Sequence, residues 1–218
     1  MTNDVFGRRP TVSVRAVVQP GVAARAALAT SLAGLHREAF PGFFLTSLGP
    51  GFLRRLYAGF LAHDQGVCVV AEEGGVVVGF ASGPLKPAAF FAGLLRRQWL
   101  GFAVAAVPGL LRNPLFAVRK CLGAVLYRGE TLEALPDAAL LSSLAVSPTV
   151  QGRGVGQMLV RAFADEVRRR GSKALYLTTD EADNERTNRF YARCGFELLD
   201  TFKRPGNRVM NRWVMRLP

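Results

Sequence analysis

The chain has 218 residues and a formal net charge of +12, and half of its residues are hydrophobic while a fifth are charged. This composition excludes a disordered chain, and the length favours one domain over residues 1–218. The three cysteines are scattered and there are two histidines, which argues against a disulfide framework and a zinc site, so we expect no metal. The basic surface suits an anionic partner: nucleic acid, an acidic membrane or a phosphate-rich small molecule.

The N-terminal part of the chain is predicted to alternate strands with helices. Apolar residues follow strand or helix spacing in a strand over 12–18, helices over 22–38 and 50–62, and strands over 66–72 and 76–82. The last two strands are separated by Glu73-Gly74-Gly75, which is typical of a β-hairpin.

Two segments bear on the cellular compartment. Residues 1–10 are polar and contain no apolar signal core, and the most apolar run, 100–111, contains Pro108. That run is shorter than the roughly 20 residues that span a bilayer. We therefore expect a cytoplasmic protein, with peripheral contact to a membrane left open.

Residues 84–136 differ from the rest of the chain because no acidic residue lies between Glu73 and Glu130. Basic and aromatic residues are interleaved there, namely Lys86, Phe90, Phe91, Arg96, Arg97, Trp99, Phe102, Arg112, Phe116, Arg119, Lys120, Tyr127 and Arg128. We expect a helical insertion of two or three helices, broken at Pro108 and Pro114.

Three interpretations of the basic, aromatic part, 84–128, stay open. It is an accessory group of solvated helices, a lid that faces an anionic or lipid-linked substrate, or a helix that lies on a membrane surface. Nucleic acid also suits the charge, but no binding motif supports it.

The C-terminal part returns to a regular pattern. It predicts a continuous strand over 139–146, a helix over 155–170, a strand over 174–178, a helix over 184–194, and an antiparallel pair over 196–202 and 207–217 around Arg204-Pro205-Gly206. The strand over 139–146 is apolar almost throughout, which favours a central position in a sheet.

A glycine-rich turn, Gln151-Gly152-Arg153-Gly154-Val155-Gly156, lies between this strand and the next helix. Backbone N–H groups at a helix N-terminus attract anions, glycines allow close approach, and Arg153 adds a positive charge. Gln157-Met158 follows Gly156, so neither a Walker A loop nor the dinucleotide fingerprint fits. The turn therefore predicts a phosphate or pyrophosphate site.

The stretch Leu144–Gly156 resembles the coenzyme A loop of the GNAT superfamily of N-acetyltransferases, with Gln151, Gly154 and Gly156 at its fixed positions. Asn184–Phe196 resembles the family's second signature, Asn-x-x-Ala-x-x-x-Tyr-x-x-x-Gly-Phe, with threonine in place of the alanine. The resemblance implies an α/β GNAT fold. Its mixed, mostly antiparallel sheet of seven strands is splayed at the central pair, flanked by helices, and here carries a helical insertion.

The resemblance also implies direct transfer of an acetyl group from acetyl-CoA to the primary amine of a small molecule, with an amino sugar favoured. Tyr191 is then the general acid that protonates the leaving thiolate. The coenzyme is implied to contact Leu144, Ala145, Val146, Gln151, Gly152, Arg153, Gly154, Val155, Gly156, Gln157, Asn184 and Asn188. The first three contribute backbone groups, and an amide near a bulge in their strand polarises the thioester.

The general base is not identified by the sequence. Asp137, Glu130 and His36 are candidates, as is a water chain through Ser142 or Ser143, although His36 is interpreted as a solvated helix residue. Other functions left open are acetylation of a protein N-terminus or lysine, and a non-catalytic acyl-CoA-binding module at a membrane. A homodimer is also left open.

Overall fold

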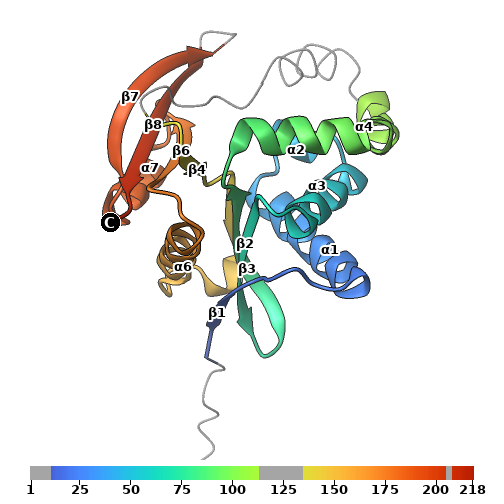
Figure 1. Cartoon of the computed structure of the whole chain (residues 1–218), viewed down its shortest axis with the longest axis horizontal. Helices are drawn as coiled ribbons and strands as arrows, with labels where there is room; N and C mark the ends of the chain where they lie inside the picture. Colours follow the sequence, from blue (N-terminus) through green and yellow to red (C-terminus); the bar gives the residue numbers. More distant parts are fainter. Residues whose placement is uncertain (1–10, 113–134, 205–207) are drawn as a thin grey trace, which may run out of the picture.

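The computed structural model describes residues 11–112, 135–204 and 208–218 (Figure 1). The elements are β1 (Ser13–Ala16), α1 (Val22–Ala39), α2 (Phe44–Ser47), α3 (Pro50–Ala62), β2 (Gly66–Glu73), β3 (Val76–Pro84), α4 (Pro87–Arg112), β4 (Ala138–Leu140), β5 (Ser143–Val146), the 3-10 turn η1 (Pro148–Val150), α6 (Val155–Arg169), β6 (Ala174–Asp180), α7 (Glu185–Arg193), β7 (Glu197–Arg204) and β8 (Arg208–Arg216).

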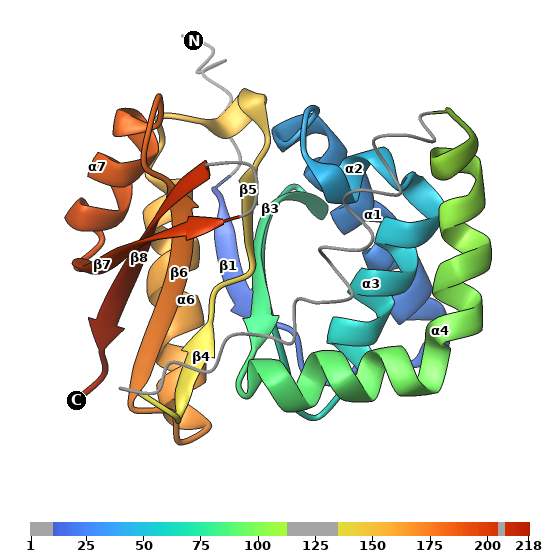
Figure 2. The same ribbon diagram turned by 90° about the horizontal axis from the view of Figure 1, so that it is seen from above.

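The strands form two four-stranded groups, in the orders β1-β2-β3-β5 and β4-β6-β8-β7. Only β4 and β6 pair in parallel among the described strands, and the other pairs are antiparallel. In Figure 2, β3 and β5 stand between the C-terminal strands on one side and α1, α2 and α3 on the other. The α/β class with a mostly antiparallel mixed sheet is therefore confirmed.

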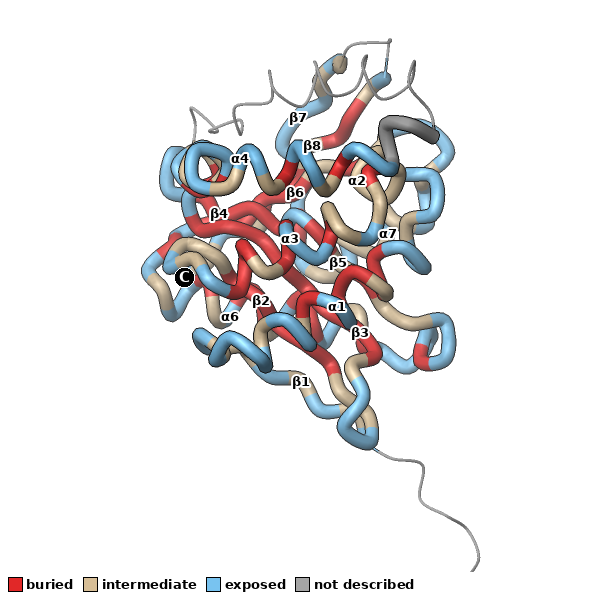
Figure 3. Tube along the Cα trace, turned by 90° about the vertical axis from the view of Figure 1, so that its right-hand side faces the viewer, coloured by how far each residue is buried: buried red, intermediate tan, exposed pale blue. Residues whose placement is uncertain are grey.

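The core lies on both faces of the first group of strands, and β2 shows how the residues divide. Val67, Val69 and Ala71 face α6, whereas Cys68 and Val70 face the layer of α1, α3 and α4. This two-residue alternation follows from the pleat of a strand that is covered on both faces. Figure 3 shows the consequence, an almost continuous buried path through β2 and β3 with exposed helix surfaces around it.

The central strand departs from its prediction, because residues 139–146 do not form one strand. The Leu141 amide donates to the Tyr176 carbonyl of β6 at 2.8 Å, whereas the Ser142 amide donates to the Ser82 carbonyl of β3 at 2.9 Å. The Ser147 amide next reaches the Val78 carbonyl of β3. The segment from residue 142 to residue 147 is thus one residue longer than the segment of β3 that it pairs with, from 78 to 82. The extra residue forms a β-bulge.

The bulge explains why the described residues form eight strands rather than the seven predicted. Residues before it belong to the group of β6, and residues after it belong to the group of β3. Gly83 makes the crossing possible, since a Cβ on it would lie 1.7 Å from the Leu140 carbonyl oxygen. A side chain at Gly83 would push the two strands apart at the point where the central strand changes partner.

The predicted break at Pro108 is wrong. Helix α4 continues past Pro108 to Arg112, and its kink lies at Gln98, whose φ and ψ of −134° and 16° are not helical. The other predicted break, at Pro114, lies outside the described residues, as does the turn at Pro205-Gly206. The single-domain organisation with an insertion over 84–136 stays a prediction.

Two short features were not predicted. Helix α2 has four residues and η1 has three, too few for a periodic apolar pattern. Among the described helices, none is both long and apolar enough to cross a membrane.

Candidate functional site

A gap separates β5 from β6 beyond the bulge. β6 pairs with β4 only over Ala174–Tyr176, and β5 pairs with β3 but with no second strand among the described residues. Along an antiparallel strand, the backbone N–H and C=O groups of successive residues point alternately toward and away from the partner strand. The backbone groups of Ser143 and Ala145 bond to β3, so those of Leu144 and Val146 point the other way, toward β6. Unpaired backbone groups need partners, so this gap suits a ligand with amides of its own.

The glycine-rich turn lies at the mouth of this gap, between β5 and α6. Gly152 and Gly154 both have a φ of +77°, and neither would meet an atom within 4 Å if it carried a Cβ. Their positive φ, which glycine adopts without strain, directs the chain into the N-terminus of α6. The first turn of α6 contains no acidic residue, so nothing there competes with an anion for its amides.

Three side chains fix the shape of this turn. The Gln151 side-chain amide donates to the Val146 carbonyl at 3.2 Å, which confirms that this carbonyl points away from β3. Arg153 forms an ion pair with Glu73 of the β2–β3 hairpin at 2.7 Å. Val155, the first residue of α6, is buried in the core. Partly exposed ion pairs are weak, so Arg153 can exchange Glu73 for a phosphate at little cost.

Gly156 has a packing role that its place in the motif did not reveal. A Cβ there would come within 3.2 Å of the Phe190 ring of α7. The missing side chain therefore lets α6 and α7 approach each other beside the gap.

Helix α7 is attached to the free end of β6 by two asparagines. Asn184, which caps the helix, and Asn188 both donate to the Asp180 carbonyl at 3.3 Å. Asn188 also accepts a 2.6 Å hydrogen bond from Thr179. These side chains thus hold the second wall of the gap in place, and contact with a coenzyme stays a prediction for both.

Tyr191 lies on α7 and is packed between two aromatic rings. Its ring centroid is 5.1 Å from that of Phe190 and 5.7 Å from that of Phe196, both in edge-to-face geometry. Burial raises the pKa of Tyr191, and the nearby Cys194 raises it further. The hydroxyl therefore keeps its proton throughout the neutral range, as a general acid must.

A cavity of about 450 Å³ lies at the other end of β5, at the bulge. It is lined by His36, Phe40, Gly42, Phe43, Phe44, Leu45, Ser142, Ser143, Asp180 and Arg208. Its volume falls in the range that binds small molecules. Asp180 and Arg208 form a bidentate ion pair with one contact of 2.6 Å, so this wall carries both charge signs.

The interpretation of His36 as a solvated residue is wrong, since it is only 4% exposed. Its Nδ1 lies 2.6 Å from the Tyr57 hydroxyl of α3. Burial lowers the pKa of His36 to about 4, so the imidazole is neutral near pH 7. Helix α1 turns this polar-looking stretch inward because Leu32, Ala33 and Leu35 pack on the same core.

Of the remaining candidates for the general base, some line the cavity and others do not. Asp137 is exposed in the turn before β4, on the far side of that strand from the bulge, and Glu130 lies outside the described residues. Ser142 and Ser143 both line the cavity. Tyr57, Asp180 and Arg208 were missed by the sequence reasoning, and only the isolated hydroxyl of Tyr57 in an apolar helix could have signalled one of them.

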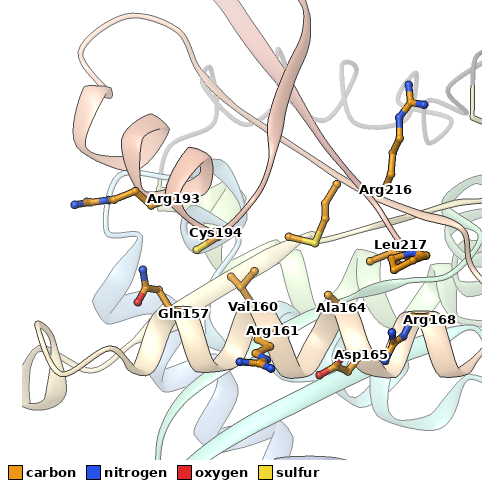
Figure 4. Close-up of a pocket in the computed structure, with 12 residues that line it drawn as sticks. Gln157, Val160, Arg161, Ala164, Asp165, Arg168, Arg193, Cys194, Arg216 and Leu217 are labelled. Atoms are coloured by element: carbon orange, nitrogen blue, oxygen red, sulfur yellow. Dashed lines mark hydrogen bonds and ion pairs between the residues drawn. The ribbon is translucent and has the colours of Figure 1, made fainter.

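A further cavity of about 440 Å³ lies between α6 and the C-terminal end of β8 (Figure 4). Gln157, Val160 and Ala164 of α6 face Cys194 and Leu217 across it, and arginines stand around its rim. It shares no lining residue with the cavity beside His36.

The family model described as the acetyltransferase (GNAT) family matches residues 30–196. That range includes the gap, the glycine-rich turn and α7, and it covers more than half of the chain. No curated protein matches the chain.

Solved structures share the fold at low identity. An aminoglycoside 6'-N-acetyltransferase complexed with coenzyme A is 12% identical with a TM-score of 0.59, covering 94% of this chain and 98% of its own. The ribosomal-protein-S18-alanine N-acetyltransferase from Escherichia coli is 13% identical with a TM-score of 0.56, covering 94% of each chain. A GNAT-family protein from Desulfovibrio desulfuricans is 19% identical with a TM-score of 0.58, covering 94% and 99%.

Proposed function

Since the chain belongs to the GNAT family of acetyltransferases, we propose that it transfers the acetyl group of acetyl-CoA to the primary amine of a small molecule. Membership of the family makes it an acetyl-CoA-dependent enzyme. The nature of the acceptor and the roles of individual residues are the substance of the proposal.

The donor half of the proposal rests on the gap between β5 and β6. Pantetheine carries two amides, and the outward-facing backbone of Leu144 and the outward-facing amide of Val146, whose carbonyl already accepts from Gln151, offer them partners along one wall. The pyrophosphate then meets the amides of residues 152–156 at the start of α6, with Arg153 beside it. The thioester lies near the bulge at Ser142-Ser143, where the acceptor cavity begins.

The meeting of the donor gap and the acceptor cavity at one bulge is the observation that carries the proposal. A volume of about 450 Å³ suits a small molecule rather than a folded protein surface. The Asp180 carboxylate is already paired with Arg208, and aromatic rings such as Phe40 and Phe43 can contact the face of a sugar. An amino sugar is therefore the favoured acceptor, and the related fold of an aminoglycoside acetyltransferase agrees with it.

Tyr191 is proposed as the acid for the leaving thiolate. Its phenol is protonated at neutral pH, as that of an ordinary tyrosine is, and burial raises its pKa further above that range. Helix α7 forms a wall of the gap through Asn184 and Asn188. The amine attacks the thioester directly, the C–S bond breaks, and the sulfur receives the phenolic proton. Backbone N–H groups at the bulge polarise the carbonyl during the attack.

A panel of amines tests this function. Acetyl-CoA is incubated with glucosamine, an aminoglycoside, a lysine-containing peptide and a peptide with a free N-terminal alanine, and release of the free thiol is measured. We expect at least tenfold higher kcat/KM for the amino sugars, because only they fit the cavity. Preference for either peptide would establish a protein acetyltransferase instead. Binding of acetyl-CoA without any turnover would favour a non-catalytic module.

We further propose that α4 rests on an anionic membrane. After the kink its exposed face is entirely apolar over positions 99, 100, 103, 104, 107 and 108, and Trp99 is 60% exposed. The exposed basic side chains of Lys86, Arg96 and Arg97 flank it, and the absence of acidic residues between 73 and 130 removes repulsion from acidic lipids. A lipid-linked acceptor would be reached from such a surface.

Tryptophan fluorescence tests the membrane contact. Vesicles of phosphatidylglycerol and phosphatidylcholine should shift the emission of Trp99 to the blue, while Trp213, which is 9% exposed, contributes a constant signal. Val104→Asp should weaken partitioning about tenfold, since a charge is costly in the interface. Leu198→Asp on exposed β7 is the matched control and should have no effect. Equal loss in both variants, or no shift at all, contradicts the contact.

A further inference from the structure

A buried polar cluster lies beneath the acceptor cavity. It consists of His36 of α1, Tyr57 of α3, Ser82 of β3 and Ser143 of β5, whose exposed fractions are 4%, 0%, 0% and 8%. The surrounding layer is aromatic and aliphatic, and it includes the stacked rings of Phe60 and Phe90. Polar groups are costly in such a layer unless they bond to one another or to a ligand.

Three members of the buried polar cluster are neighbours, and Ser82 lies beside them without a hydrogen-bond partner of its own in the described structure. His36 Nδ1 lies 2.6 Å from the Tyr57 hydroxyl. The Ser143 side chain, a polar neighbour of the Tyr57 hydroxyl, moderates the rise that burial causes in the pKa of Tyr57. Ser82 stands directly opposite Ser143 in the pairing of β3 with β5. A chain of polar groups therefore runs from the wall of the cavity to the strand that also borders the donor gap.

Two polar atoms of the buried polar cluster lack a hydrogen-bond partner among the described residues. His36 Nε2 and Ser82 Oγ are buried and have no hydrogen-bond partner in the described structure. His36 lines the cavity, and its nearest ring neighbour there is the apolar Phe40, at 4.9 Å. The other charged or titratable side chains that line the cavity are Asp180 and Arg208, which neutralise each other. Nε2 itself is covered by the lining of the cavity, so a molecule there becomes its partner only when the lining shifts to expose it.

We propose that His36 is the general base, accepting through Nε2 a proton from the acceptor amine in this cavity. The inference rests on the proposed acetyl transfer and deepens it. The proposal requires the tautomer in which Nδ1–H donates to the Tyr57 oxygen and Nε2 keeps its lone pair, so Tyr57 is a positioning residue. Because burial holds the pKa of His36 at about 4, the amine binds as the free base, and Nε2 takes the proton that the amine nitrogen loses as the N–C bond forms. The imidazolium then passes this proton to water in the cavity.

Acyl transfer proceeds from the free amine. The free amine lone pair forms the N–C bond as the C–S bond breaks, and the sulfur takes a proton from Tyr191. Water then returns a proton to the Tyr191 phenolate. Because the alkylammonium has already lost one proton to the solvent, one proton is released in total per acetyl group transferred, and the base is needed only for the proton of the adduct.

Substitution of the two histidines provides a matched test, using the amine of the panel with the fastest turnover. His36→Gln keeps a polar atom near Nε2 but cannot take up a proton, so kcat should fall by about 100-fold or more while the Kd for acetyl-CoA stays unchanged. His63→Gln removes the other histidine, whose Nδ1 accepts from the Gln65 amide, and should leave kcat unchanged. A His36→Gln variant with a kcat within about twofold of the wild type would overturn the proposal.

Two further readouts separate a base from a structural residue. Added imidazole should restore turnover to His36→Ala, and Tyr57→Phe should lower kcat less than His36→Gln does. If no amine is acetylated, the proposed function fails, and the base is judged by NMR instead. The ¹⁵N shifts of His36 should then respond to glucosamine in the presence of CoA while those of His63 do not. A His36 signal that ignores the amine overturns the proposal.

Discussion

Replacing Tyr191 with phenylalanine should lower kcat by about 100- to 1,000-fold while the Kd for acetyl-CoA stays the same. The phenyl ring keeps its edge-to-face contacts with Phe190 and Phe196, so the shape of α7 is preserved. The lost group is the hydroxyl, which is protonated at neutral pH and whose pKa burial raises further. Without it the thiolate must leave unprotonated or take its proton from water. Steady-state kinetics with a saturating amine measures the effect.

Tyr176→Phe is the matched control for this change. Tyr176 is buried on β6 in the small cluster with Ala138 and Val214, away from α7. Its substitution can alter stability, but kcat per folded enzyme should stay within about twofold. A Tyr191→Phe variant with full kcat for every amine would remove Tyr191 from the mechanism. That result would not affect the proposed binding of the coenzyme in the gap between β5 and β6 and at the glycine-rich turn.

Replacing Gly154 with valine should weaken acetyl-CoA binding by about 10- to 100-fold. Gly154 has a φ of +77°, and a Cβ would meet no atom within 4 Å, so the cost is conformational rather than steric. A β-branched residue is strained there by roughly 1–3 kcal/mol. The turn relieves this strain by moving, and its amides then no longer converge at the N-terminus of α6. Titration calorimetry with acetyl-CoA measures the loss.

Gly171→Val supplies the control, because the same helix has a second glycine with positive φ at its other end. Gly171 has a φ of +90° and also has open space around its Cβ position. It should show a comparable loss of thermal stability with an unchanged Kd for acetyl-CoA. Equal weakening of the Kd in both variants would mean that strain in α6, and not the turn itself, governs binding.

The elements with strong local signals could be predicted from the sequence. The hairpin at Glu73-Gly74-Gly75 and helix α6 lie where the pattern placed them, because turn glycines and helical spacing act over a few residues. The glycine-rich turn could be predicted from the sequence in the same way. Its amide donors belong to consecutive residues, so the sequence contains the whole motif.

Features that depend on distant partners could not be predicted. The apolar run over 139–146 indicates burial on both faces, but it does not say that β6 is its partner before Ser142 and β3 is its partner after it. The reason for the change lies in Gly83, nearly 60 residues earlier, whose missing Cβ admits the Leu140 carbonyl. Local periodicity contains no information on such a crossing.

The acceptor side of the site depends even more on tertiary structure. His36 stands in the sequence between Leu35 and Arg37, a context that suggests a solvated helix end. Its burial follows from the packing of α1 on α3, which brings Tyr57 to its Nδ1. Asp180 and Arg208 likewise come together only because β6 and β8 pair. Three distant segments thus build one cavity.

A crystal structure of the chain with coenzyme A tests the central claim most directly. We predict the pyrophosphate on the amides of residues 152–156, the pantetheine between β5 and β6, and the sulfur near the bulge at Ser142-Ser143. A coenzyme bound in the cavity between α6 and the end of β8, or a gap closed by pairing of β5 with β6, would contradict this arrangement of the donor site.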